Sequence, residues 1–322
     1  MTLRWAVVAT GGMARAMVED FHLIPDAELK VIVSRTQTRA DEAAREWNIP
    51  EGSSNYDSVL QRTDIDAVYI ATPHVFHFEQ SKRALEAGKH VLVEKPITMN
   101  ATEARELQKV AKRSGKFLME AMWMVFSPAI IEALRVAQSG ELGKVTFAEA
   151  NFGVAFDFDH SKAATSRLWN RELGGGTLLD QGIYPISLAH ELFGTPIESH
   201  VRGDIGETDI DVEAAMVLEF AGGERAALSS SMRNHTPLNA SISGDKGFIE
   251  IESPFWVPPA IRKLTRDPKT QRILTDERVE FVKEGNGYVP MLREVHSAIN
   301  SGATEHANQT EIVSQEIGFL AD

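Results

Sequence analysis

Short apolar runs and longer amphipathic stretches alternate along the first 120 residues of the chain. β-branched and aliphatic side chains gather in runs of strand length, and these runs are separated by stretches with helical periodicity. Strands that alternate with helices are typical of a doubly wound, parallel α/β sheet. The pattern predicts strands near residues 3–8, 28–33, 66–71, 89–93 and 116–120, and helices near 12–21, after 36, up to 87 and 100–114.

The pattern changes after Trp123. Strands now follow one another closely with Gly and Asn turns between them, which predicts a large, mostly antiparallel open sheet in an α+β domain. A helix over 177–193 should cover its core face, and the Pro-rich, charged stretch 253–276 is expected to form surface excursions. Further helices are expected at 128–138, 289–300 and 310–321, and strands near 145–152, 197–205, 212–220, 224–232, 239–244 and 247–251. We therefore expect a dinucleotide-binding domain over 1–122 and a substrate-binding domain over 123–322.

Composition narrows the class of protein. The 322 residues carry a net charge of −13 and contain no cysteine. The acidic balance argues against a nucleic-acid or anionic-membrane partner, and the lack of cysteine excludes disulfides and thiolate chemistry. A strand begins near Leu3 and no long apolar run follows, so we expect a cytoplasmic protein.

The first strand leads into a glycine-containing turn, Ala9-Thr10-Gly11-Gly12-Met13-Ala14. This turn matches the dinucleotide motif G-x-G-x-x-A except that Ala9 replaces the first glycine. Gly11 lets the backbone approach a pyrophosphate, and the helix that follows offers amide donors to the phosphates. A plain tight turn is the alternative interpretation.

The second strand ends in Ser34 and Arg35, with Arg39 one turn into the next helix. A site for NAD usually has Asp or Glu at this strand end, to bind the ribose hydroxyls. A hydroxyl and guanidinium groups suit a 2′-phosphate instead. The sequence therefore favours NADP, with NAD possible and solvated arginines as the alternative.

Two further strand ends carry polar side chains. Thr72, Pro73, His74 and His77 follow the strand near 66–71, and contacts with cofactor ribose and substrate are expected there. The H-x-x-H spacing has no convincing third ligand, so no metal is expected. Glu94-Lys95-Pro96 ends the next strand, at the sheet edge where open α/β sheets bind ligands. A solvated surface lysine is the alternative.

The helix after Gly174-Gly175-Gly176 carries Asp180 and Tyr184 four residues apart, and therefore on one face. The glycines allow close approach of another chain segment or of a cofactor. A core tyrosine and a helix-dipole partner are the alternative roles for these two residues.

Taken together, these motifs resemble the Gfo/Idh/MocA oxidoreductases. The segment Met119-Glu120-Ala121-Met122-Trp123, with Phe126 and Pro128 after it, is similar to the branch of dimeric dihydrodiol dehydrogenases and NADP-dependent D-xylose 1-dehydrogenases. The resemblance implies an N-terminal Rossmann domain and a C-terminal domain with an open antiparallel sheet. It also implies a homodimer or a dimer of dimers formed through that sheet.

The resemblance also implies roles for individual residues. Lys95, Tyr184 and Asp180 match catalytic positions, with Trp123, Phe152, Asp180 and Tyr184 facing substrate. Phe156 and Trp169 are further candidates to line the substrate pocket. The cofactor would be bound by Ala9, Gly11, Gly12, Met13, Ser34, Arg35, Arg39, Thr72, Pro73, His74, His77, Glu94, Lys95, Trp123 and Arg167.

The implied reaction moves hydride between a nicotinamide and a CH–OH group of a sugar, polyol or trans-dihydrodiol. A tyrosine with a pKa near 10 is a poor base at neutral pH, and a neighbouring ammonium group lowers that pKa. Lys95 and Tyr184 are therefore expected to act as a proton-transfer pair. The alternatives are a non-catalytic dinucleotide sensor and an NAD-dependent enzyme that cleaves glycosides.

Overall fold

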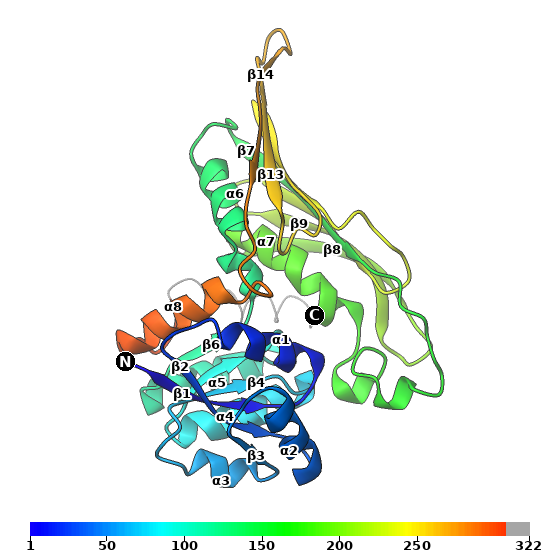
Figure 1. Cartoon of the computed structure of the whole chain (residues 1–322). Helices are drawn as coiled ribbons and strands as arrows, with labels where there is room; N and C mark the ends of the chain where they lie inside the picture. Colours follow the sequence, from blue (N-terminus) through cyan, green and yellow to red (C-terminus); the bar gives the residue numbers. More distant parts are fainter. Residues whose placement is uncertain (307–322) are drawn as a thin grey trace. The chain divides into compact units, whose positions relative to one another are not determined.

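The computed structural model describes residues 1–306, which form two compact units (Figure 1). Met1–Trp123 and residues 284–306 make the first unit, and Met124–Lys283 make the second. The first boundary lies one residue from the predicted one. The chain after Glu284 returns to the first unit, however, whereas the prediction placed it in the second. Helical periodicity alone does not say which sheet a terminal helix covers.

A parallel sheet forms the centre of the first unit, as predicted. Its six strands lie in the order β3-β2-β1-β4-β5-β6, and each neighbouring pair is parallel. The strands are β1 (Leu3–Val8), β2 (Ala27–Val33), β3 (Glu51–Ser53), β4 (Ala67–Ile70), β5 (His90–Val93) and β6 (Leu118–Glu120). Because the strands are parallel, their carboxyl ends share one edge.

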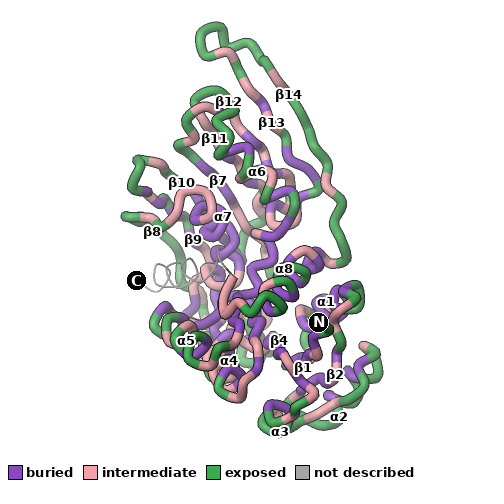
Figure 2. The backbone as a smooth tube through the Cα atoms, turned by 90° about the vertical axis from the view of Figure 1, so that its left-hand side faces the viewer, coloured by how far each residue is buried: buried purple, intermediate pink, exposed green. Residues whose placement is uncertain are grey.

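Helices cover both faces of this sheet. Trp5 of β1 packs on Phe21 and His296, so α1 and α8 lie on one face. Ala6 and Val8 face the other side, in a core shared with α3, α4 and α5. Figure 2 shows the burial of β1 and β4 between these layers. The helices of this unit are α1 (Gly12–Phe21), α2 (Gln37–Glu46), α3 (Tyr56–Leu60), η1 (His74–Phe76), α4 (His77–Glu86), α5 (Ala101–Ser114) and α8 (Val289–Asn300). The short helix η2 (Trp123–Phe126) spans the boundary to the second unit.

The second unit is built on one large, mostly antiparallel sheet, as predicted. Its eight strands lie in the order β14-β13-β12-β11-β7-β10-β9-β8, and β7 with β10 is the parallel pair. The strands are β7 (Val145–Gly153), β8 (Pro196–Ile205), β9 (Asp211–Phe220), β10 (Arg225–Ser231), β11 (Ala240–Gly244), β12 (Gly247–Ile251), β13 (Ala260–Arg266) and β14 (Ile273–Glu280).

Two helices pack on one face of that sheet. The predicted cover, α7 (Ile183–Phe193), packs on β7 and β10, and α6 (Pro128–Gln138) packs on β12 and β13. The even-numbered residues of β9 are buried toward these helices, and the odd-numbered ones are partly or fully exposed. The short turns are η3 (Ala163–Thr165), η4 (Arg171–Leu173) and the π-helical η5 (Leu178–Gly182).

The expectation of surface excursions over 253–276 was wrong, because β13 and part of β14 lie in this range. Charged side chains suggested loops there, but they form pairs across the two strands. Arg262 binds Asp276 through two hydrogen bonds of 2.7 Å, and Lys263 Nζ lies 3.0 Å from Glu277. Most of β14 is exposed (Figure 2). Paired charges are a common way to protect such an edge strand.

The expected helix over 310–321 lies outside the described residues. Within residues 1–306, no helix has the length and hydrophobicity needed to cross a membrane.

The environment of His90 predicts a pH dependence of stability. Its Nδ1 accepts a hydrogen bond of 3.0 Å from the Phe117 amide, which requires the neutral ring. Burial, with help from Lys116, lowers the pKa of His90 to about 4. Since the unfolded chain binds this proton near pH 6.5, His90 adds stability above that pH. That stability is lost as the pH falls from about 6.5 to about 4.

We therefore expect the variant His90→Asn, which keeps an acceptor, to lose less stability on acidification than the wild type. The difference should be on the order of 1 kcal/mol, once solvent screening is allowed for. Urea denaturation at several pH values measures it. The exposed His200 gives the control, because His200→Asn should follow the wild type. Equal slopes for all three proteins would exclude this role of His90.

Candidate active site

The turn between β1 and α1 is open where the sequence predicts a pyrophosphate. No side chain caps the start of α1 at Gly11. Among residues 1–306, a Cβ atom on Gly11 or Gly12 would meet no atom within 4 Å, and neither residue has a positive φ. Neither packing within the described part of the chain nor backbone conformation therefore requires glycine at these positions. The amides and the dipole of the helix start fit phosphates that approach the backbone closely.

Ala9 stands in the turn with an unusual backbone. Its φ of +132° is one that non-glycine residues rarely adopt. The Ala9 amide donates a hydrogen bond of 3.1 Å to Val33 O, so pairing with β2 holds the residue in place. Such a conformation costs about 1–3 kcal/mol. Ala9, at the first glycine position of the motif, therefore keeps the conformation of the turn but strains the backbone.

The end of β2 presents hydroxyl and guanidinium groups beside this turn. Ser34 Oγ lies 3.4 Å from Thr10 Oγ1. Arg35 and Arg39 are exposed, and Thr36 caps α2 by accepting from the Arg39 amide. Within residues 1–306, no carboxylate forms an ion pair with either guanidinium. Both groups are thus suited to bind an added phosphate.

His77 joins two loops at the ends of β4 and β5. Its side chain is fully buried, and its ring nitrogens lie 2.7 Å from Pro96 O and 2.7 Å from Thr72 O. Burial is the largest influence on the pKa of His77 and lowers it, while the two carbonyl groups act in the opposite direction. These contacts position the loops after both strands. Direct contact of His77 with cofactor stays a prediction.

The other residues of the β4 loop share this arrangement. Thr72 Oγ1 donates to Gln80 Oε1 at 2.7 Å, and Pro73 precedes the short helix η1. The rings of His74 and His77 meet edge to face at 5.7 Å. Within residues 1–306, no group of three or more His, Asp and Glu side chains is placed to hold a metal ion.

Glu94 and Lys95 are buried directly after β5. They are 5% and 8% exposed. The Tyr69 hydroxyl donates to Glu94 Oε1 at 2.6 Å, and the Lys95 amide donates to Oε2 at 3.3 Å. The Lys95–Pro96 peptide bond is cis. Lys95 therefore lies buried at the carboxyl edge of the parallel sheet, where open α/β sheets bind ligands; its catalytic role stays a prediction.

Glu120, at the end of β6, is a further buried acid that the sequence reasoning passed over. It is 1% exposed, and its Oε1 accepts a hydrogen bond of 2.6 Å from the Ile97 amide. Burial raises the pKa of Glu120 to about 7; Lys95 opposes this shift and Glu94 adds to it. The end of the strand next to Lys95 was the signal that could have identified this residue.

Trp123 is linked through Tyr288 to Met13, at the start of α1. Its ring lies 4.9 Å from that of Tyr288, and the Tyr288 hydroxyl lies 4.0 Å from Met13 Sδ. Asp20 of α1 accepts hydrogen bonds from the amides of Asn286 (2.7 Å) and Tyr288 (2.8 Å). The segment that returns from the second unit is therefore held by the dinucleotide helix.

In the second unit, the glycines before Tyr184 are explained by chain packing. A Cβ on Gly175 would lie 2.6 Å from Leu168 O, and one on Gly176, whose φ is +131°, would lie 2.2 Å from Asp211 Oδ1. Asp211 also accepts a hydrogen bond of 2.6 Å from the Leu178 amide. Of the two predicted reasons for these glycines, close approach of a chain segment is the one observed.

Tyr184 lies in an aromatic cluster with Phe152 and Trp256. The rings of Phe152 and Trp256 stack at 3.9 Å with 3° between their planes. The Tyr184 ring lies 5.5 Å from Phe152 and 6.0 Å from Trp256. Trp256 was missed because it lies in the stretch interpreted as a surface excursion. A tryptophan between two prolines was the available signal.

Asp180 lies on the π-helical turn before α7, and such turns are frequent at functional sites. Arg167 Nη1 donates to Asp180 Oδ1 at 2.8 Å, with the carboxylate 12% and the guanidinium 46% exposed. The predicted cofactor contact of Arg167 is untested. Lys95 belongs to the first unit and Tyr184 to the second, so their pairing also stays a prediction.

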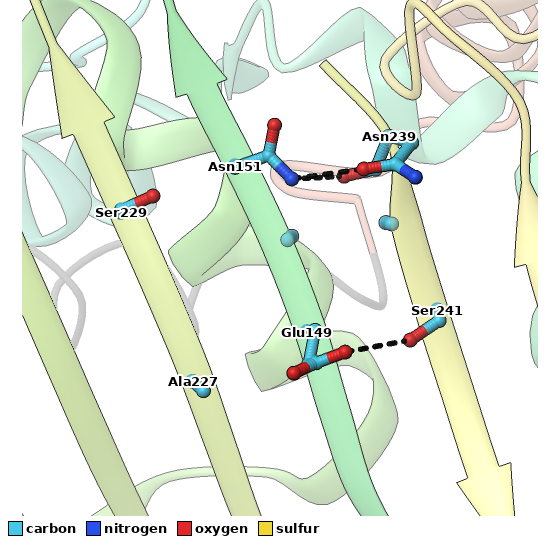
Figure 3. A pocket seen from close by; sticks show the side chains of 8 residues that line it. Glu149, Asn151, Ala227, Ser229, Asn239 and Ser241 are labelled. Carbon is cyan, nitrogen blue, oxygen red and sulfur yellow. Dashed lines mark hydrogen bonds between the residues drawn. The ribbon is translucent and has the colours of Figure 1, made fainter. Parts of the chain in front are cut away.

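The outer face of the second sheet carries a polar hollow of about 270 Å³, lined by short side chains of β7, β10 and β11. Asn151 Nδ2 donates to Asn239 Oδ1 at 2.9 Å, and Ser241 Oγ lies 3.5 Å from Glu149 Oε2 (Figure 3). None of the predicted site residues lines it.

The first unit has a Rossmann sheet, a glycine turn after β1 that is open to a pyrophosphate, and a buried lysine directly after β5. These features are typical of an oxidoreductase that depends on a nicotinamide dinucleotide. Residues 3–122 match the model of the "Oxidoreductase family, NAD-binding Rossmann fold", and residues 130–250 match the "GFO/IDH/MocA C-terminal domain". The chain belongs to the Gfo/Idh/MocA family, as the sequence motifs indicated.

Similar proteins agree with this assignment. The trans-1,2-dihydrobenzene-1,2-diol dehydrogenase of Mus musculus is 36% identical over 286 residues, which cover 87% of this chain and 80% of the relative. That of Xenopus tropicalis is 32% identical, with 100% and 97% covered.

Two solved structures share the fold. A 3-ketoreductase from Actinomadura kijaniata, in complex with NADP and TDP-benzene, has a TM-score of 0.86 at 24% identity, with 100% of this chain and 96% of that chain covered. A levoglucosan dehydrogenase in complex with NADH and levoglucosan has a TM-score of 0.89 at 21% identity, with 98% and 95% covered.

The strained backbone of Ala9 predicts that Ala9→Gly stabilises the protein. Relief of the strain exceeds the entropy that a glycine adds to the unfolded chain, so we expect a gain of about 1 kcal/mol. Thermal denaturation measures it. Ala16, in the helical part of α1, is the matched control, because Ala16→Gly should lower stability by about 1 kcal/mol. A loss of stability in both variants would show that Ala9 is not strained.

Proposed function

We propose that this protein is a cytoplasmic dehydrogenase that oxidises a CH–OH group, with Lys95 and Tyr184 as its proton-transfer pair. The observation that carries the proposal is the burial of Lys95 directly after Glu94, at the carboxyl edge of the dinucleotide-binding sheet, where its charge also acts on the buried Glu120. A bound nicotinamide would supply the hydride acceptor for the carbinol carbon. The protein must then remove the proton of the hydroxyl group.

Tyr184 is the proposed partner of the substrate hydroxyl. An ammonium group near a phenol favours the phenolate, so Lys95 would lower the pKa of Tyr184 toward the working pH. Asp180 would orient a substrate hydroxyl, because its carboxylate is largely enclosed and already bound on one side by Arg167. The scheme holds equally if Lys95 takes the proton from the substrate hydroxyl directly and Tyr184 supports it.

The proposed substrate carries adjacent hydroxyl groups on a six-membered ring. The stacked rings of Phe152 and Trp256, with Tyr184 beside them, offer an aromatic wall next to a hydroxyl group. Aromatic faces suit both a cyclohexadiene diol and the apolar face of a pyranose. The relatives named for trans-1,2-dihydrobenzene-1,2-diol support the diol, and the levoglucosan complex supports the sugar.

NADP is the proposed cofactor. Arg35 and Arg39 would bind its 2′-phosphate, which strand ends with a carboxylate disfavour. The Actinomadura structure holds NADP, whereas the levoglucosan dehydrogenase holds NADH. The exposed arginines of this chain favour the phosphorylated form.

A homodimer through the outer face of the second sheet is proposed as well. Phe147 is 36% and Val217 is 38% exposed, on strands whose other face packs on α7. An exposed sheet face that mixes apolar side chains with short polar ones suits a second copy of the same face.

The test of function is reduction of NADP+ with trans-dihydrodiols, aldoses and inositols. We expect turnover in the wild type and a loss of about 100-fold or more in Lys95→Met and in Tyr184→Phe. Lys89 provides a matched control, since it is also buried but lies before β5, where its ammonium donates to Arg62 O and Ile65 O. Tyr56→Phe is the control for the tyrosine.

Lys89→Met and Tyr56→Phe should therefore keep normal kcat in whatever folded protein they yield. Near-normal turnover in both Lys95→Met and Tyr184→Phe would refute the proton-transfer pair. Binding of NADP without turnover of any substrate would favour a dinucleotide sensor instead.

Cofactor preference is tested with the double variant Arg35→Ala/Arg39→Ala. Each charged hydrogen bond contributes about 1.5–3 kcal/mol, so KM for NADP+ should rise by about tenfold or more while KM for NAD+ changes little. Arg45→Ala, at the far end of α2, is the control and should leave both values unchanged. An equal rise in both KM values would argue against recognition of the 2′-phosphate.

A further inference from the structure

Glu120 has one buried carboxyl oxygen that forms no hydrogen bond within residues 1–306. The side chain is 1% exposed. Its Oε1 accepts the hydrogen bond from the Ile97 amide at 2.6 Å. Its Oε2 is buried and has no hydrogen-bond partner within residues 1–306. An unpaired buried oxygen on an ionised carboxyl group is unfavourable by several kcal/mol, so this group requires an explanation.

The charged neighbours of Glu120 explain why an acid occupies this position. β6 pairs with β5 in register, with Glu120 opposite Val93, two residues before Lys95. The charged groups that act on Glu120 are the Lys95 ammonium, which favours its ionised form, and the Glu94 carboxylate, which disfavours it. His77 bonds to Pro96 in the same loop and is acted on by Lys95 too. Glu120 therefore shares its charge environment with Lys95.

Support of the loop alone does not account for an acid at this position. An amide oxygen would accept the Ile97 hydrogen bond equally well, without the cost of a buried ionisable group. Glu103 of α5 gives a comparison, because it also binds the loop after Pro96: its Oε2 accepts from the Met99 amide at 3.2 Å. Glu103 is partly exposed, whereas Glu120 is buried and the charges of Lys95 and Glu94 act on it.

We propose that Glu120 is a positioning residue that sets the proton occupancy of Lys95 while it holds the loop after Pro96. The inference rests on the proposed function, in which Lys95 takes part in proton transfer. An ionised Glu120 stabilises the Lys95 ammonium and raises its pKa, and a protonated Glu120 does not. One proton moves between the Glu120 carboxyl and solvent in this change, and no other bond is altered.

Burial that raises the pKa of Glu120 to about 7 places this change in the physiological range. Removal of a negative charge near a lysine lowers the pKa of that lysine by about one unit or more. In the pH profile of kcat, the apparent pKa that belongs to Lys95 should therefore be lower in Glu120→Gln than in the wild type. This direction holds whether Lys95 acts as the base or stabilises a tyrosinate.

The experiment compares kcat and KM for the wild type, Glu120→Gln and Glu103→Gln between about pH 5 and about pH 9. We expect a shift of about one pH unit in kcat for Glu120→Gln, little change in KM for NADP+, and a wild-type profile for Glu103→Gln. Superimposable profiles for all three proteins would overturn the proposal, because a purely structural residue would change stability only.

A second measurement does not depend on activity. Infrared titration of the wild type without cofactor should show the carbonyl band of a protonated buried carboxyl group, lost with a midpoint near pH 7. Burial also raises the pKa of Glu191 to about 7, so the titration is repeated in Glu191→Gln, where the band of Glu120 should remain. Labelling of glutamate with ¹³C should shift this band, and Glu103→Gln should retain it. Absence of the band in the wild type overturns the proposal, even where Glu120→Gln does not fold. A titrating band in a protein with no turnover would instead count against the proposed function alone.

Discussion

A lysine can be buried at the end of a parallel strand only where neighbouring groups balance its charge, and the first unit is arranged around this constraint. The buried carboxyl groups of Glu94 and Glu120 stand at the ends of β5 and β6, and the charge of Lys95 favours the ionised form of Glu120. His77 joins the loops after β4 and β5 through their carbonyl groups. The Rossmann topology brings these three strand ends to one edge, so the same sheet that binds a dinucleotide also builds the cationic site.

The second unit orients its functional groups by a different device. Asp211, at the start of β9, accepts the Leu178 amide and leaves no room for a side chain on Gly176. The sheet thereby holds the start of the helical segment that carries Asp180 and Tyr184. Tyr184 then packs against Phe152 and Trp256, which come from a strand and a loop of the same unit. A rigid sheet and a constrained helix start together leave the tyrosine little freedom.

Much of this could be predicted from the sequence, where local patterns decide the outcome. Strand and helix periodicity identified both sheets, and the turn at Gly11 was recognised from its residue types. The return of α8 to the first unit was not predictable, because its periodicity is equally compatible with either sheet. β13 and β14 were missed since Arg262 and Asp276 pair across strands, and charges paired in this way resemble a loop in the sequence. Trp256 was lost with them. Glu120 was recognised only as part of a family motif, because burial and an unpaired oxygen are properties of the folded chain.

Glu94 and Glu120 carry the same side chain but differ in the hydrogen bonds that their carboxyl oxygens accept. Both oxygens of Glu94 have donors, one from the Tyr69 hydroxyl and one from the Lys95 amide. Glu120 has a donor at one oxygen only. Hydrogen bonds to a carboxylate favour its charged form, and burial without them favours the neutral form. Burial raises the pKa of Glu120 to about 7, so this carboxyl group takes up a proton near neutrality. The two acids differ in their donors because the Tyr69 hydroxyl reaches Glu94 from the adjacent strand β4, whereas Oε2 of Glu120 has no donor within residues 1–306.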